Sequence, residues 1–152
     1  MKRGIVFMLS ICMLMLCGMS SCRENDSATK EELLVGKWKS TKVDFLDYEN
    51  GKLVYEVSEK CISWYMALDF RDNGTGTIVK TEDGGAEVSV EEIKSWTIMG
   101  EDLIITFDSG EVDEPSEIIE LNNKSMILKF VGEETYNSIK YRYEDIYYFT
   151  KI

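Results

Sequence analysis

The sequence predicts an all-β fold: a single antiparallel up-and-down β-barrel of about eight or nine strands that opens with a short helical turn. Apolar and polar residues alternate in successive short segments, which is the period of half-buried strands. Small turn-forming residues, mainly glycine, asparagine and aspartate, separate these segments, as expected for tight turns between antiparallel strands. Beyond the opening turn, no segment has the apolar period of a helix.

The first 22 residues have the pattern of an export signal. Lys2 and Arg3 precede an apolar run at 4–18, which is shorter than the ~20 residues of a membrane-spanning helix. The run ends in Met-Ser-Ser-Cys at 19–22. This ending resembles a bacterial lipobox, in which the cysteine becomes the first residue of the mature chain and carries a lipid, so the resemblance implies that Cys22 is lipidated. The alternative is an ordinary signal peptide followed by an incidental cysteine.

Three parts of the chain are therefore expected: a lipoprotein signal peptide at 1–21, a lipidated tether at 22–29 and a barrel domain at 30–152. The expected location is the bacterial outer membrane, where the lipid on Cys22 anchors the protein on the periplasmic side or at the cell surface. Acidic residues close to the lipidated cysteine resemble the surface-export signals of lipoproteins in the Bacteroidetes. Arg23, at the second mature position, departs from that pattern.

Charge and composition exclude several functions. The chain holds 17 basic and 28 acidic residues, a formal net charge of −11, which argues against binding to nucleic acid. It has no histidine, so Ser-His-Asp and Cys-His catalysis and histidine metal sites are excluded. Cys61 has no partner once the signal is removed and Cys22 is acylated, and we interpret it as a small buried apolar residue.

The barrel domain begins with a capping box at 29–32, which predicts a helical turn that stops at Gly36. From 62 to 70 every second residue is apolar, so this segment is predicted to be a strand with one buried face. An Asn-Gly pair at 73–74 predicts a tight hairpin to a return strand at 77–81.

The same pattern continues to the C-terminus. Further strands are predicted by apolar alternation within 88–98, 103–107, 118–121, 126–130 and 139–149, with turns at 83–85, 100–102 and 122–124 and a loop at 109–116. Segment 51–60 fits either a strand or a short helical lid. A β-sandwich is the main alternative fold, but its crossings need longer connections than most of those found here, whereas a barrel has no exposed edges.

A motif at the start of the first strand points to a family. Gly-Lys-Trp at 36–38 resembles the Gly-x-Trp motif that opens the lipocalin barrel. The stretch FRDNGTGT at 70–77, and Trp96 followed by Gly100 and Leu103, are similar to lipocalin-like lipoproteins of the Bacteroidetes. The resemblance covers the whole mature chain and implies a lipocalin-like barrel.

The resemblance also implies structural roles. In lipocalins the motif's tryptophan plugs the closed end of the barrel, and an arginine from near the last strand crosses it. This assigns the closed end to Gly36, Trp38 and Arg142. The chain has no cysteine pair to match the disulfide of many secreted lipocalins, and the other lipocalin motifs are not recognisable in it.

A barrel of about eight strands is either filled by its own side chains or holds one small ligand. Large residues at strand spacing are the candidates for lining a cavity: Trp64, Met66, Phe70, Trp96, Phe107, Tyr141 and Tyr143. Without a cavity, the same side chains would pack as a solid core.

Two functions therefore remain open. The protein is either a lipid-anchored binder of a small apolar or amphipathic ligand, or a ligand-free barrel that serves as a structural or interaction module for another envelope protein. The acidic clusters at 82–92 and 108–117 lack the alternating ligands of a calcium loop, so we expect no metal and no cofactor. No carboxylate pair is marked for acid–base chemistry, so we expect no catalytic residues and no enzymatic activity.

Overall fold

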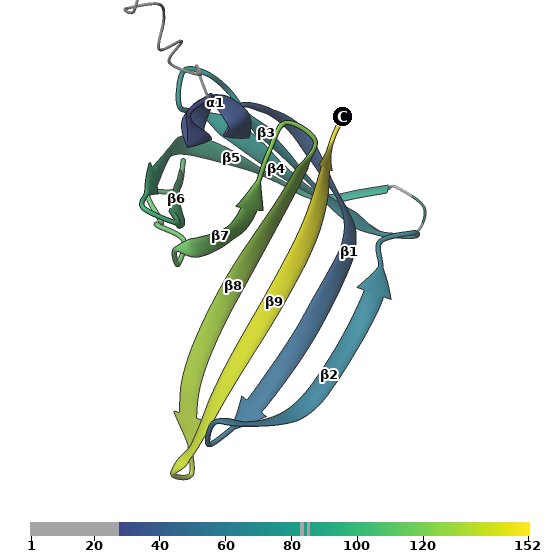
Figure 1. The fold of residues 1–152 in the computed structure, drawn as a ribbon, viewed down its shortest axis with the longest axis vertical. Helices are drawn as coiled ribbons and strands as arrows, with labels where there is room; N and C mark the ends of the chain where they lie inside the picture. Colours follow the sequence, from purple (N-terminus) through teal and green to yellow (C-terminus); the bar gives the residue numbers. More distant parts are fainter. Residues whose placement is uncertain (1–27, 83, 85) are drawn as a thin grey trace, which may run out of the picture.

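Nine strands follow one short helix in a computed structural model of the chain, which describes residues 28–152 except 83 and 85 (Figure 1). The elements are α1 (Lys30–Leu34), β1 (Gly36–Glu49), β2 (Lys52–Lys60), β3 (Tyr65–Phe70), β4 (Gly76–Glu82), β5 (Ala86–Met99), β6 (Asp102–Phe107), β7 (Ser116–Leu121), β8 (Ser125–Tyr136) and β9 (Ile139–Lys151). The predicted signal peptide and Cys22 lie outside the described residues. No helix among the described residues is long and apolar enough to cross a membrane.

Strand β1 closes the sheet into a barrel because it pairs along one edge with β9. Its other edge is divided: residues 36–39 pair with β3, and residues 42–49 pair with β2. Eight antiparallel strands, β1 and β3 to β9, therefore form the closed barrel, and β2 is an additional strand. This confirms the predicted all-β barrel with a helical turn at its start, and it shows that 51–60 contains a strand and not a helical lid.

Four strands continue past the barrel as an extension, formed by the far parts of β1, β2, β8 and β9 (Figure 1). β8 pairs with β9 as far as Tyr136 and Ile139, whereas its pairing with β7 covers only residues 126–129 of β8. The extension therefore leaves the barrel on the side away from α1, which sits over the other end (Figure 1). The barrel is closed at the α1 end and open at the end where the extension begins.

The strand predicted at 62–70 is shorter than expected, because β3 begins only at Tyr65. Ile62 is 84% exposed and Trp64 is half-buried in the connection from β2. The physical reason is the division of β1. The chain must leave the edge of β1 after β2, and a bulge between Ser40 and Lys42 separates the two pairing segments. The predicted alternation, with one buried face, is present from residue 66 onward.

Two layers of apolar side chains fill the closed half of the barrel. The outer layer, next to α1, contains Leu34, Trp38, Phe70, Leu103, Met126 and Phe149. The layer beneath it contains Leu68, Ile78, Ile93, Ile105 and Leu128. Except for Leu34 of α1, these residues lie on strands, and where one strand contributes to both layers they are two positions apart, as the period of two in the sequence predicts.

Trp38 plugs the closed end and also completes the short helix α1. A five-residue helix leaves most of its carbonyl groups without intrahelical partners. The Trp38 indole Nε1 donates to the carbonyl oxygen of Leu34 at 2.7 Å, and Lys151 Nζ donates to that of Leu33 at 2.9 Å. At the other end of α1, Thr29 and Glu32 form the predicted capping box.

The residue that crosses Trp38 is Lys151, so the expected role of Arg142 is wrong. Lys151 Nζ lies 4.9 Å from the centre of the Trp38 ring, a cation–π contact. Arg142 lies far along β9, on the extension, where it forms ion pairs with Glu144 at 2.7 Å and Glu133 at 3.7 Å. The register explains the difference, because Trp38 pairs with Lys151 at the C-terminal end of β9, whereas Arg142 pairs with Tyr48 near the far end of β1.

Gly36 is favoured by its backbone conformation, and it lies against the same lysine. Its φ is 131°, a backbone conformation that other residues rarely adopt, and a Cβ there would lie 2.5 Å from Lys151 Cε. The glycine of the Gly-x-Trp motif therefore makes room for the lysine that covers the tryptophan.

We expect Trp38→Phe to lower the free energy of unfolding by about 2 kcal/mol or more, because the change leaves the buried Leu34 carbonyl without its donor and opens a small cavity. Trp64→Phe is the matched control, since Trp64 is only half-buried, and should cost less than about 1 kcal/mol. Urea denaturation of the two variants measures both values. Equal losses would contradict the plug.

Candidate functional site

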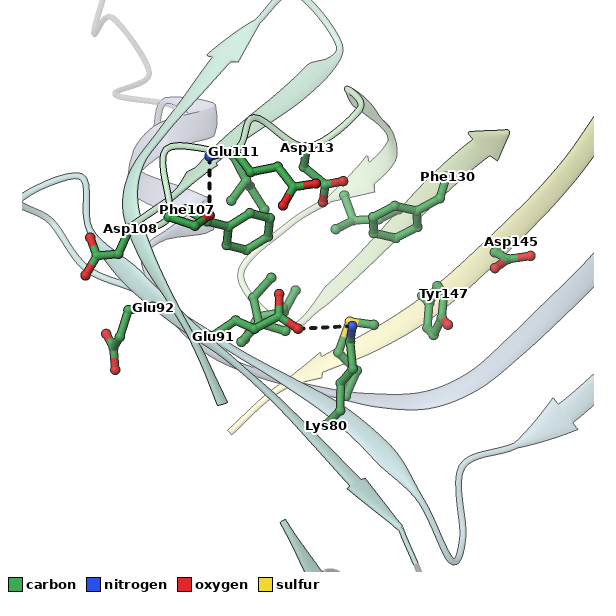
Figure 2. Close-up of a pocket in the computed structure, with 16 residues that line it drawn as sticks. Lys80, Glu91, Glu92, Phe107, Asp108, Glu111, Asp113, Phe130, Asp145 and Tyr147 are labelled. Carbon is green, nitrogen blue, oxygen red and sulfur yellow. Dashed lines mark hydrogen bonds and ion pairs between the residues drawn. The ribbon is translucent and has the colours of Figure 1, made fainter. Parts of the chain in front are cut away.

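The open half of the barrel contains a cavity of about 520 Å³ (Figure 2). Its floor belongs to the second core layer and consists of Leu68, Ile78, Ile105 and Leu128. Its walls are the larger side chains of Met66, Phe107, Phe130 and Tyr147. Small-molecule sites are commonly apolar hollows of roughly 300–1,000 Å³, so this cavity has the size and the lining of a ligand site.

Acidic residues line this cavity, and we call them the acidic mouth: Glu91, Glu92, Asp108, Glu111, Asp113 and Asp145. The carboxylate of Glu92 itself lies outside, 3.4 Å from Thr77 Oγ1. Among the described lining residues, Lys80 is the one basic side chain. Lys80 Nζ lies 3.4 Å from Glu91 Oε1, as the dashed line in Figure 2 shows. Lys80 follows the floor residue Ile78 on β4 by two positions, so the alternation of the strand directs it to the interior.

Asp145 is held in an apolar setting on β9. Its neighbours in register are Phe45 on β1 and Phe130 on β8. Burial among these groups raises the pKa of the Asp145 carboxyl, and the nearby negative charge of Asp47 raises it further. Ionised Asp145 is therefore partly desolvated at the mouth.

Asp113 reaches the mouth from the loop between β6 and β7. Its backbone N–H donates to the Ile105 carbonyl at 2.9 Å, which folds the loop back onto β6. The Glu114 N–H donates to Asp113 Oδ1 at 3.0 Å. Burial is the main reason that the pKa of Asp113 is raised, and Lys80 acts in the opposite direction.

Aromatic side chains stand next to these carboxylates. Tyr147 and Phe130 make an edge-to-face pair with ring centres 5.5 Å apart. Burial, together with the charge of Asp145, raises the pKa of Tyr147 to about 12. Tyr147 therefore stays uncharged at neutral pH and offers a hydroxyl group to the interior.

The structure brings two of the predicted lining residues, Met66 and Phe107, to the cavity. Phe70 is instead part of the closed-end layer, where it is 1% exposed and meets Trp96 edge-on at 5.8 Å. The Trp96 indole donates to the Thr75 carbonyl at 3.1 Å, which fixes it at the β3–β4 turn. The predicted cavity role of Phe70 and Trp96 is therefore wrong, because both lie too close to the plugged end.

Three other predicted lining residues lie away from the cavity. Trp64 sits in the β2–β3 connection. Tyr141 and Tyr143 share a face of β9 with Tyr147, as the alternation predicts, but they lie on the extension beyond the mouth. There the Tyr143 hydroxyl donates to Glu134, which raises the pKa of Tyr143 to about 12. Apolar–polar alternation predicts which side of a strand a side chain occupies, but it does not predict how far along the barrel axis the residue lies.

Sequence reasoning missed Phe130, Tyr147 and the acidic mouth. Phe130 continues the apolar alternation of residues 126 and 128, so its inward direction was readable. The acidic clusters at 82–92 and 108–117 lack the pattern of a calcium loop, yet several of their members line the cavity. Inward acidic residues near strand ends carry no distinctive local signal.

The remaining candidate groups stand apart from the cavity. Cys61 receives a weak hydrogen bond from the Ser40 hydroxyl at 3.4 Å, and burial raises its thiol pKa, so it is uncharged at neutral pH. The described residues contain no cluster of three or more acidic or cysteine side chains placed to hold a metal ion.

We expect Asp145→Asn to raise the melting temperature at pH 7 by on the order of 1–3 °C. A carboxyl whose pKa is raised on folding binds its proton more tightly in the barrel than in the unfolded chain, so its ionised form destabilises the barrel. The gain should shrink as the pH falls toward 3.8, the ordinary aspartate value. Asp102→Asn, exposed at the start of β6, removes the same charge and is the control in thermal denaturation at several pH values. An equal gain in both variants would contradict this account.

Comparison with known proteins agrees with the architecture. A family model described as a lipocalin-like domain matches residues 34–128. This range runs from the end of α1 into β8 and includes Gly36, Trp38 and most of the cavity lining. Searches among curated proteins and among solved structures found no match. The chain belongs to the lipocalin-like domain family.

Proposed function

We propose that this protein is a lipid-anchored binding protein of the bacterial cell envelope that holds a small amphipathic molecule in its barrel. The observation that carries the proposal is the cavity of about 520 Å³. The closed half of the barrel is filled by two apolar layers, whereas the open half is hollow although large side chains line it. An apolar floor beneath a charged opening suits a ligand with an apolar body and a polar head.

The position of α1 gives the proposed anchor a direction. α1 covers the closed end of the barrel (Figure 1), and the tether at 22–29 leads into it. A lipid on Cys22 would therefore be joined to the domain at the closed end of the barrel, at the end opposite the cavity opening.

We propose binding and not catalysis. Covalent catalysis needs a nucleophile beside a base that activates it. Ser109 is the one hydroxyl nucleophile of serine or threonine type among the described lining residues, and the chain has no histidine to activate it.

The extension favours a second function, that of an interaction module. β2 lies at its edge and exposes Leu53, Val54 and Tyr55. Exposed edge strands offer unpaired main-chain groups to a partner strand. An envelope protein could pair with this edge whether or not the cavity is occupied.

We expect Met66→Trp to abolish uptake of an uncharged naphthylamine dye, because the larger side chain fills the cavity wall. Dye fluorescence measures binding. Met99→Trp is the matched control, since Met99 is 64% exposed outside the cavity, and it should bind the dye as the unmodified protein does. No dye binding by the unmodified protein would overturn the ligand-binding proposal and favour the interaction module.

We expect Cys22→Ser to move the protein from the membrane fraction to the soluble fraction of its own bacterial host and to remove the lipid mass from the mature chain. Cell fractionation and mass spectrometry of the intact protein measure the two effects. Cys17→Ser, within the predicted signal peptide, is the control and should change neither. A Cys22→Ser protein that keeps its lipid mass would contradict the anchor.

A further inference from the structure

The negative charge of the acidic mouth indicates which class of ligand the cavity takes, on the basis of the proposed ligand binding. We infer that the cavity takes a cationic amphiphile, whose apolar tail lies on the floor of the barrel and whose ammonium or similar head lies among the carboxylates of the mouth.

Negative charge predominates at the opening of the cavity. Six acidic residues, of which Glu92 directs its carboxylate outward, line the cavity together with the single basic residue among the described lining, Lys80. Lys80 is already within 3.4 Å of Glu91, so its charge is largely compensated. An anionic head would meet net repulsion at this opening, whereas a cationic head would meet attraction strengthened by the low-dielectric walls.

Asp113 and Asp145 are partly buried and lie outside the ion pairs of the described residues. Neither carboxylate forms an ion pair with another described residue. Both are partly buried, and Asp145 lies in register between Phe45 and Phe130. Partly desolvated carboxylates without a counter-ion destabilise the empty barrel, and their raised pKa values reflect this. A bound organic cation would supply the missing charge.

Aromatic side chains line the cavity together with the acidic residues. Phe107, Phe130 and Tyr147 line the same cavity as Asp113 and Asp145, and Figure 2 shows these side chains around one space. Aromatic faces attract cations, and cages of such rings recognise quaternary ammonium groups. Carboxylates and rings together therefore favour an alkylated ammonium head.

A metal ion fits this arrangement less well. Calcium needs six to eight oxygen ligands that converge on one point. The carboxylates here come from β5, the β6–β7 loop and β9, and they are spread around the opening (Figure 2). No group of three among the described residues converges closely enough to hold a metal. A larger organic cation can contact separated carboxylates in turn.

The test compares ligands that share one tail and differ in the head. Dodecyltrimethylammonium, dodecyldimethylamine oxide and dodecanoate carry a positive, a neutral and a negative head at neutral pH. Each competes with the bound naphthylamine dye, below its micelle concentration and at low salt. We expect the trimethylammonium compound to bind at least about tenfold more tightly than the amine oxide, with dodecanoate the weakest. Added salt should reduce the preference.

Two variants test whether the preference for a cationic head depends on the carboxylates of the acidic mouth. Asp113→Asn and Asp145→Asn should each reduce the preference for the cation over the amine oxide by about threefold or more, measured as the ratio of the two affinities within each variant. Asp102→Asn, which removes the same charge on the outside of the closed end, should leave the preference unchanged.

The outcomes separate this inference from the proposed function. Dye binding with equal affinity for the three heads, or with dodecanoate preferred, would overturn the inference and leave the binding function standing. Displacement of the cation by micromolar calcium would overturn it in favour of a metal site. Failure to bind the dye would overturn the binding function, and the inference with it.

Discussion

Strand β1 runs for 14 residues, and its backbone groups need partners on both edges. β9 satisfies one edge along almost the whole length of β1, but β3 pairs with only the first four residues of the other edge. β2 pairs with the rest. This division explains the shape of the molecule: a barrel that closes where β1 meets β3, and an open end where β1, β2, β8 and β9 continue without the other strands.

The closed end is stabilised by one group of contacts, which meets three structural requirements. The helix α1 needs donors for its last carbonyl groups, the barrel needs a plug, and the plug needs a partner for its indole N–H. Trp38 and Lys151 satisfy all three, and Gly36 leaves the space in which the lysine chain passes. The two motif residues and the final basic residue thus form one structural unit.

The open end has the opposite character. Its floor is apolar and packed, but the ring of carboxylates above it is poorly compensated by the chain's own cations. Such an arrangement costs stability in the empty protein. A stability cost concentrated at the opening of a cavity is a common property of binding sites, where groups are set for a partner and not for the fold.

The sequence by itself determined most strands, most turns and the capping box, because these depend on alternation and turn chemistry that act between near neighbours. The segment at 51–60, left open between strand and helical lid, was decided only by its pairing with β1. Only the tertiary structure decided which inward residues fill the barrel and which surround a hollow. That outcome depends on strand length and register, which set how far along the barrel each residue lies. Phe70 and Met66 share one face of β3, yet one is core and the other lines the cavity. For the same reason Lys151, and not Arg142, reaches Trp38.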